Sequence, residues 1–279
     1  MKNAWKTWGP IISRQICEPI QASNVIDLGD KLRPLMYNAY EKKENPTLSE
    51  TQSMKSTSGV LWESLLVWYC NLCLIGTRSV VMRKNKQLVP KQFLEAISTN
   101  YGIKKEDSEA DLIVLTFPNH SDFLDNVKKN GRSALKKLVD THFGDFELGI
   151  ISCKTPWNDF SVIPKHWNLV YRLTLEHPDV LDEQIGTDTF NIRNLKKFYY
   201  AFATLPSQKP DIIKSDGLPV LRLMNLSGGT YWGLPSKEGI AKSMKEFFEK
   251  NISHMKDEDL SNLEKELPKL STHYPYFNL

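Results

Sequence analysis

The chain contains 279 residues, of which 41% are hydrophobic, and it carries a formal net charge of +3 at pH 7. This length suits one large domain or two small ones, and the apolar content is sufficient for a buried core. The small net charge excludes a protein that holds nucleic acid through a uniformly basic surface. Any such contact must come from a local patch, such as the basic clusters at residues 83–86, 128–132 and 136–137.

The cysteines and the first residues favour a reduced, cytoplasmic protein. The four cysteines have no framework spacing, and the pair Cys70 and Cys73 lacks the second pair that a zinc site would need. We therefore expect free, mostly buried thiols. The N-terminal residues lack the apolar core of a signal peptide. Residues 59–76 are strongly apolar, but Glu63 and Asn71 interrupt them, which favours a core helix over a membrane span, and we expect no membrane partner.

The N-terminal part of the chain is predicted to be helical up to about Tyr40. The polar run from Glu41 to Ser58 is typical of a loop or mobile linker. We therefore divide the chain into an N-terminal region with its linker, residues 1–58, and a core, residues 59–279, packed as one compact unit. A helix then begins near Ser58, and its buried stripe recurs at helical spacing. The stripe comprises Trp62, Leu65, Leu66, Tyr69, Leu72 and Cys73.

Two short apolar runs, residues 112–115 and 148–151, are predicted to be neighbouring strands buried on both faces. A strand at residues 79–83 and a short helix at residues 90–100 precede them. The basic pattern at residues 122–142 predicts a helix between the two strands. Such a connection favours a right-handed crossover and parallel pairing, although insertions could allow another arrangement.

The C-terminal half is predicted to contain further helices and strands. We expect helices at residues 168–176, 240–252 and 257–270, and strands at residues 197–205 and 218–224. A glycine-bearing loop at residues 226–233 lacks the lysine of a nucleotide-binding P-loop. It favours a tight turn or a close approach to a DNA backbone.

The residues at the strand ends could carry chemistry. Asp111 heads the first apolar run and Lys154 ends the second, while Ser152 shares the face of Lys154 because side chains alternate along a strand. A carboxylate that binds a divalent metal, with a lysine that stabilises charge, suits phosphodiester hydrolysis. Glu147 faces away from Lys154 and is excluded unless a bulge resets the register. The histidines at positions 120, 142, 166 and 177 show no metal-ligand spacing, and we expect them at the surface or in local hydrogen bonds.

These motifs resemble the type II restriction endonucleases of the PD-(D/E)xK nuclease superfamily. In that family an acid begins one strand, and an acid, any residue and a lysine follow on the next. Here Asp111 has no preceding proline, and the second motif reads Ser152-Cys153-Lys154, with serine in place of the second acid. A subset of restriction enzymes has such a Ser-x-Lys element. Together with the segments at residues 151–159 and 227–233, the motifs look most like restriction enzymes related to Bpu10I and BbvCI.

The resemblance implies a restriction-endonuclease-like α/β fold, with a mixed central sheet flanked by helices. It also implies Mg²⁺-dependent hydrolysis of double-stranded DNA at a short specific sequence, by a homodimer or a heterodimer. Asp111 and Glu63, the latter on an upstream helix, would hold the metal. Lys154 would position the attacking water and stabilise charge, with Ser152 beside it. Side chains suited to reading bases include Lys165, Arg172, Arg193 and Arg222.

Other interpretations remain open. Asp159 could supply the second carboxylate, although Trp157-Asn158-Asp159 also suits an ordinary turn. Glu63 could instead neutralise a buried lysine or arginine, and Asp111 could simply cap a turn. The functional alternatives are a PD-(D/E)xK nuclease for repair or another substrate, and a non-catalytic DNA-binding subunit.

Overall fold

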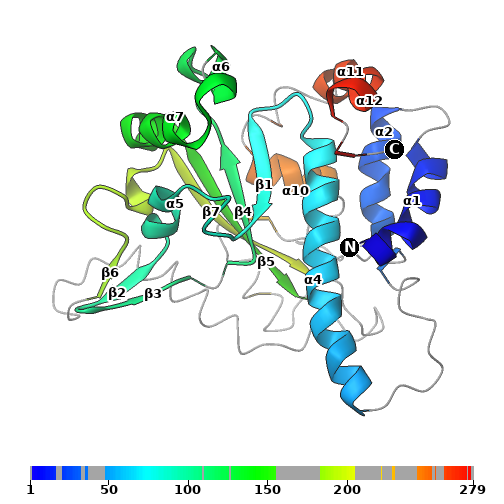
Figure 1. The fold of residues 1–279 in the computed structure, drawn as a ribbon, viewed down its shortest axis with the longest axis horizontal. Helices are drawn as coiled ribbons and strands as arrows, with labels where there is room; N and C mark the ends of the chain where they lie inside the picture. The colour runs from blue at the N-terminus through cyan, green and yellow to red at the C-terminus, as the bar shows by residue number, and fades with distance from the viewer. Residues whose placement is uncertain are drawn as a thin grey trace.

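The centre of the fold is a four-stranded mixed sheet. The structure, a computed structural model, describes residues 2–16, 21–32, 35–36, 48–108, 110–125, 127–154, 183–204, 221, 228–229, 244–252, 255, 261–274 and 276–277. The strands are β1 (Ser79–Arg83), β4 (Leu112–Thr116), β5 (Glu147–Lys154) and β7 (Lys197–Thr204), in the order β1-β4-β5-β7 (Figure 1). β4 pairs antiparallel with β1 and β5, whereas β5 and β7 are parallel. The expectation of an α/β fold with a mixed sheet is confirmed.

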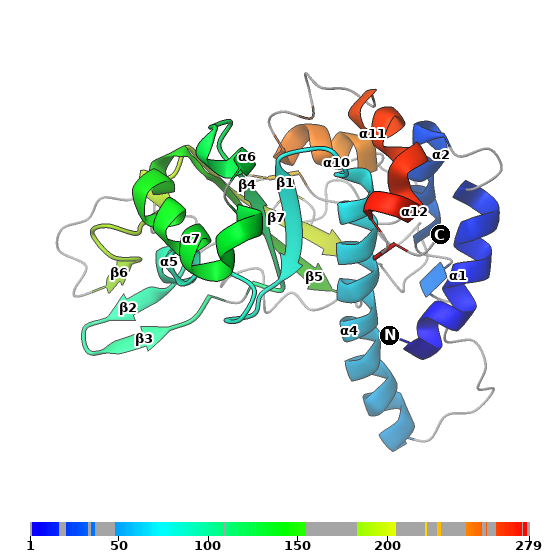
Figure 2. The same cartoon turned by 45° about the horizontal axis from the view of Figure 1, so that its top comes forward.

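Helices cover both faces of this sheet (Figures 1 and 2). One face packs against α4 (Leu48–Cys73) and α10 (Met244–Asn251), with α1 (Lys2–Ile16), α2 (Ala22–Asp27) and η1 (Leu28–Lys31) beyond α4. The C-terminal α11 (Ser261–Glu266), η6 (Leu267–Lys269) and α12 (Leu270–His273) lie on the same side. The other face packs against α5 (Lys91–Ala96) and α7 (Val127–His142), which follows the short α6 (Asp122–Asp125).

Alternation along the strands divides the interior into two apolar cores. Ile151 and Cys153 of β5 belong to the core under α4, whereas Leu148 and Ile150 belong to the core under α5 and α7. Every residue of β4 is buried. The prediction that these strands are buried on both faces is therefore confirmed, and Ser152 and Lys154 lie on the α7 side by the same alternation.

A second, three-stranded antiparallel sheet lies beside the first (Figure 1). Its order is β3-β2-β6, formed by β3 (Lys104–Glu106), β2 (Thr99–Tyr101) and β6 (Glu183–Ile185). The helix expected at residues 90–100 therefore ends early, at Ala96. Ser98 donates both its backbone N–H and its hydroxyl to the carbonyl of Glu95, which ends the helix before the β-favouring Thr99.

Helix α4 begins at Leu48, ten residues before its expected start. The linker predicted for residues 41–58 is therefore wrong for residues 48–58, and residues 41–47 lie outside the described part of the chain. The boundary expected at residue 58 falls inside the helix. Residues 48–73 contain no proline. Because extending an existing helix costs far less free energy than nucleating one, the polar residues 48–58 extend the apolar helix toward the N-terminus.

Side chains of α4 connect this helix to three other elements. Asn71 completes the outer edge of β1, because its amide accepts the N–H of Val81 at 2.9 Å and donates to the Val81 carbonyl at 2.7 Å. Trp62 donates to the carbonyl of Ala203 on β7, and Tyr69 donates to the carbonyl of Ile26 in α2. Edge strands expose unpaired backbone groups, and Asn71 satisfies those of Val81.

Two glycines allow elements to approach closely. A Cβ on Gly149 of β5 would lie 2.1 Å from the ring of Tyr199, its partner on β7. Gly228 donates its N–H to the carbonyl of Tyr200, and a Cβ there would lie 2.6 Å from Asn251 of α10. Gly228 of the glycine-bearing loop therefore lies close to β7 and α10. A contact between this loop and DNA stays a prediction.

The remaining elements agree with the sequence where they are described. The strand expected at residues 197–205 is β7, and the last two expected helices overlap α10 and α11 to α12. The helix expected at residues 168–176 lies outside the described residues, as does the strand at residues 218–224 apart from Leu221. The described cysteines, at positions 70, 73 and 153, are free and buried, as expected. Among the described helices, none combines the length and apolar character needed to cross a membrane.

Candidate active site

Antiparallel pairing of β4 and β5 brings the two predicted motifs to one edge of the sheet. Leu112 pairs with Ile151, so Asp111, which precedes β4, lies level with Ser152. The parallel pairing favoured by the intervening helix is wrong. Thr116 pairs with Glu147, so β4 ends and β5 begins at the same end of the sheet. The segment that contains α6 and α7 is therefore the long connection of an antiparallel β-hairpin. Only this pairing lets the head of one strand meet the tail of the other.

The carboxylate of Asp111 is held by β5. Its Oδ2 accepts a hydrogen bond from the backbone N–H of Cys153 at 2.6 Å and another from the Ser152 hydroxyl at 3.1 Å. Both bonds end on Oδ2, so neither uses the lone pairs of Oδ1. Ser152 is fully buried. The serine in place of the second acid therefore orients the first acid.

Glu63 enters the same edge from α4. Its side chain is 17% exposed, and its Oε2 lies 2.7 Å from Nη2 of Arg83, the last residue of β1. Burial raises the pKa of Glu63, Arg83 opposes that shift, and the negative charge of Asp111 adds to it. Lys154 also lowers the pKa of Glu63, so the charges of Glu63, Asp111 and Lys154 act on one another. The structure thus brings together the four residues predicted from the sequence.

Lys154 ends β5 beside the end of β7. Its register partner is Thr204, and the two side chains share a face because β5 and β7 are parallel. The Thr204 hydroxyl is fully buried and has no hydrogen-bond partner among the described residues. The sequence did not indicate this buried hydroxyl beside Lys154.

Other residues considered from the sequence lie elsewhere. Glu147 is buried at the opposite end of β5, where Lys196 approaches it at 3.7 Å, which agrees with its exclusion. Arg193 is exposed in η3 (Ile192–Asn194). Asp159, Lys165, Arg172 and Arg222 lie outside the described residues, so their expected roles stay predictions.

A basic turn follows β1 at the same edge. Lys84 donates its backbone N–H to the carbonyl of Asp111, and Lys86 is largely exposed, with Asp107 at 3.6 Å. Together with Arg83, these residues bring positive charge to the edge that carries Asp111. The basic cluster at residues 83–86 is therefore a neighbour of the candidate site.

One group of histidines is not scattered as the sequence suggested. His120 and His142 lie at 4.7 Å between ring centroids, and both contact Asp122. Both make local polar contacts, as expected, but α6 and α7 fold back and bring them together with Asp122, which their spacing in the sequence did not indicate. His166 and His177 lie outside the described residues.

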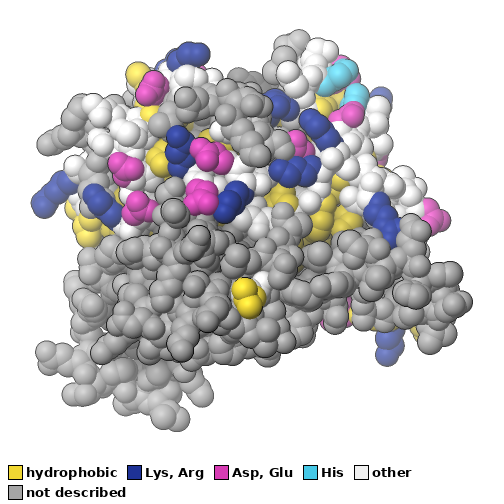
Figure 3. Space-filling view, turned by 180° about the vertical axis from the view of Figure 1, so that it is seen from behind, with side chains coloured by type: hydrophobic (Ala, Val, Ile, Leu, Met, Phe, Trp, Pro, Cys, Tyr) yellow, Lys and Arg dark blue, Asp and Glu magenta, His cyan; other side chains and the backbone are white. Residues whose placement is uncertain are grey.

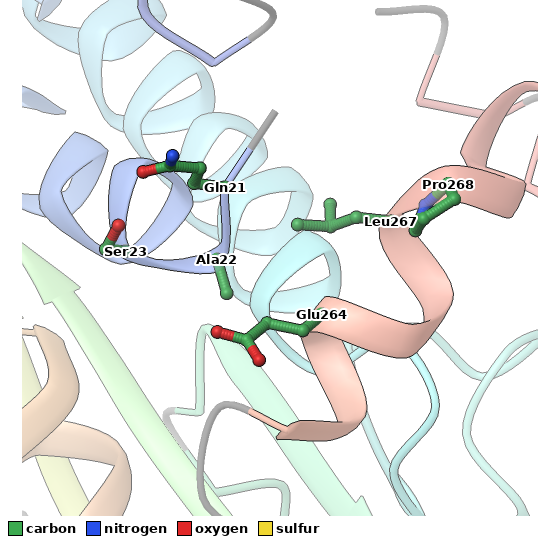
Figure 4. A pocket seen from close by; sticks show the side chains of 6 residues that line it. All are labelled: Gln21, Ala22, Ser23, Glu264, Leu267 and Pro268. Atoms are coloured by element: carbon green, nitrogen blue, oxygen red, sulfur yellow. The ribbon is translucent and has the colours of Figure 1, made fainter. Parts of the chain in front are cut away.

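A pocket of about 510 Å³ lies between α2 and the C-terminal helices (Figure 4). Its lining includes Gln21 and Ser23 from the first segment and Glu264 and Leu267 from the second. It contains none of the residues gathered at the sheet edge. Its one charged lining side chain is Glu264, and this pocket has no role in the function proposed below.

No protein-family model matches the chain, and no curated protein matches it. The residues at the sheet edge are therefore the basis on which a function is proposed.

Proposed function

We propose that this protein is a Mg²⁺-dependent endonuclease that hydrolyses double-stranded DNA at a specific sequence, as type II restriction endonucleases of the PD-(D/E)xK superfamily do. The observation that carries the proposal is the meeting of Asp111, Lys154 and Glu63, from three separate elements, at one edge of the sheet. Ser152 completes this group by bonding to Asp111.

The oxygen atoms at this edge suit Mg²⁺. Asp111 and Glu63 supply carboxylates, the hard ligands that this ion prefers. Bound Mg²⁺ would polarise the scissile phosphate and lower the pKa of a bound water. The ion pair with Arg83 competes with this role of Glu63. Glu63 would therefore act through its other oxygen, or after release from Arg83.

The protein's own groups supply orientation and charge. The two hydrogen bonds to Oδ2 hold Asp111 in a single orientation. The ammonium of Lys154 can donate to a non-bridging phosphate oxygen and stabilise the negative charge that develops in the transition state. It can also position the attacking water.

DNA would be held through local contacts. Lys86, which is largely exposed, can contact a phosphate at the same edge, and Arg83 could do so on releasing Glu63, which agrees with a small net charge overall. Base recognition needs side chains in the grooves, and Arg193 is an exposed candidate within the described residues.

Incubation of the purified protein with supercoiled plasmid DNA and Mg²⁺ tests the proposal. Discrete fragments would support sequence-specific cleavage, and excess chelator should abolish them. Asp111→Asn should also abolish cleavage, whereas Glu249→Gln, a matched loss of charge on the exposed side of α10, should cut at the wild-type rate. Smearing would instead indicate a nuclease of a different substrate range. Cleavage that persists in chelator would contradict the metal requirement.

A non-catalytic DNA-binding subunit is the alternative that a specific observation favours. Ser152 stands where the family has its second acid, and Glu63 already forms an ion pair with Arg83. Such a subunit would retard DNA in a gel but leave plasmid intact with Mg²⁺ or Mn²⁺. Cleavage restored by a second, different chain would assign this protein to a heterodimer.

A further inference from the structure

Three side chains with metal-binding atoms meet at the end of the sheet opposite Asp111. His120 follows β4, Asp122 begins α6, and His142 ends α7. One ligand atom from each lies within 4.8 Å of the other two. At the surface over α6 and α7, histidine side chains adjoin an acidic one (Figure 3). The group is thus accessible to an ion from solvent.

The separations suit a tetrahedral ion. Oδ2 of Asp122 lies 3.4 Å from Nε2 of His142 and 3.5 Å from Nδ1 of His120. Nitrogen and oxygen ligands at 2.0–2.1 Å from Zn²⁺ in tetrahedral geometry are separated by about 3.3 Å. Two of the three ligand edges are therefore close to the required length. Nδ1 of His120 also accepts a hydrogen bond from the Asp122 N–H, at a long 3.3 Å, which a bound ion would replace.

A second carboxylate orients one of the histidines. Nδ1 of His142 lies 3.3 Å from Oδ2 of Asp145, while Nε2 faces Asp122. Histidine ligands of metals usually donate their other ring N–H to a carboxylate, which fixes the tautomer and leaves the ligand nitrogen unprotonated. His142 is also only 16% exposed and packs against Phe123. Asp145 can therefore hold the His142 ring in place with Nε2 directed at Asp122, the orientation that a shared metal ion would need.

We propose that His120, Asp122 and His142 bind a Zn²⁺ ion, with water at the remaining position. Imidazole ligands suit Zn²⁺ and other late divalent transition ions and do not suit Mg²⁺. Three protein ligands leave one tetrahedral position, and the half-exposed side chains of His120 and Asp122 let water reach it. The ion joins the turn after β4 to the end of α7 and so fastens α6 and α7 to the sheet.

This site is separate from the edge proposed for DNA cleavage. The five residues of β4 lie between Asp111 and the segment with His120, a span of about 17 Å in an extended strand. Two of the described thiols, on α4, are weak competitors for the ion. Cys70 and Cys73 are buried, and burial raises the pKa of Cys73 to about 12, so the thiolate that zinc needs is not available.

Isothermal titration of the folded, metal-free protein with ZnCl₂ tests the proposal without DNA. We expect saturable binding of one ion. His142→Gln and Asp122→Asn should each weaken it by at least about 100-fold, and Asp145→Asn, which only orients His142, by about 10-fold. His273→Gln, a histidine change in α12, should leave the affinity unchanged. Asp111→Asn should also leave it unchanged, which separates this site from the cleavage site.

A thermal shift provides a second readout for variants whose titration heat is small. Zn²⁺ should raise the melting temperature of the wild-type protein and of His273→Gln, because an ion that binds only the folded state stabilises it. The rise should vanish in His142→Gln, whose folding is checked by far-ultraviolet circular dichroism. Absence of saturable zinc binding by the wild-type protein, or equal binding by His142→Gln and wild type, would overturn the proposal.

Discussion

Glu63 has two proposed roles, in a structural ion pair and as a metal ligand, and a comparison of stability with cleavage separates them. Burial raises the pKa of Glu63 despite Arg83, so folding disfavours its charged form on balance. We therefore expect Glu63→Gln to unfold at the same or a higher temperature than wild type at pH 8, while its cleavage rate falls at least about 100-fold as a metal ligand is lost. A less stable variant that cuts normally would assign Glu63 to the ion pair alone.

The same shift gives the pH dependence a definite sign. An acid with a raised pKa in the folded state destabilises the fold once it is ionised, and that cost disappears as pH falls through the folded pKa. Metal binding needs the ionised form. The Mg²⁺ concentration needed for half-maximal cleavage should therefore rise as the pH falls, because protons compete with the ion for Glu63. In the absence of Mg²⁺, the difference in melting temperature between wild type and Glu63→Gln should shrink over the same pH range.

Lys154 is expected to act mainly in the transition state. Lys154→Ala should abolish cleavage but weaken DNA binding only several-fold, because affinity draws on many phosphate contacts. Gel retardation and plasmid cleavage on the same preparation measure the two effects. Lys137→Ala, which removes an equal charge from exposed α7, is the control and should cut normally. A folded Lys154→Ala protein that cuts at the wild-type rate would remove Lys154 from the mechanism.

At the scale of elements, the contact between β5 and β7 depends on one glycine. Gly149 leaves room for the Tyr199 ring, whose hydroxyl is buried and has no partner among the described residues. Gly149→Ala should lower the free energy of unfolding by about 1–3 kcal/mol through overpacking. Tyr199→Phe should leave it unchanged or raise it, because a buried hydroxyl without a partner is lost. Urea unfolding measures both.

A compensating change makes the steric cause testable. Tyr199→Leu in the Gly149→Ala background should recover part of the loss, since the smaller side chain vacates the space that the added methyl group needs. Simple additivity of the two changes would contradict a direct clash. The result also bears on the candidate site, because β5 and β7 together position Lys154 and Thr204.

The elements were easier to predict from the sequence than their pairing. Short runs of β-branched and other apolar residues predict buried strands such as β4. The alternation of side chains along a strand predicts that Ser152 and Lys154 share a face. The direction of pairing did not follow, because a helix between two strands is usual in a parallel crossover and here belongs to an antiparallel hairpin. Asp111, before the first strand, and Lys154, at the end of the second, can meet only if the two strands are antiparallel. That requirement could have predicted the direction of pairing from the sequence.

At the scale of the whole molecule, contacts between residues that are distant in the sequence were the other feature that the sequence did not predict. The side chains of His120 and His142 meet only after α6 and α7 pack, so spacing along the chain did not reveal them. The start of α4 was missed for a similar reason, since its first turns are polar and resemble a linker until they continue a helix anchored by Trp62 and Tyr69. The proximity of Asp111, Ser152 and Lys154 could be predicted because their motifs are local to strand ends, whereas Glu63 was proposed from the family resemblance.

The N-terminal helices share one core with the sheet, and this predicts a single unfolding transition. Trp8 of α1 is buried in the cluster that includes Leu112 of β4, and its indole N–H donates to the Leu35 carbonyl at 2.9 Å. Trp8→Ala should lower the free energy of unfolding of the whole chain by about 3–5 kcal/mol, because it leaves a large cavity. Trp8→Phe, which keeps most of the ring, should cost less.

Tryptophan fluorescence and far-ultraviolet circular dichroism should report coincident transitions in urea for wild type and both variants. Two separate transitions, with only the first shifted by Trp8→Ala, would instead show that residues 1–58 fold as an independent unit.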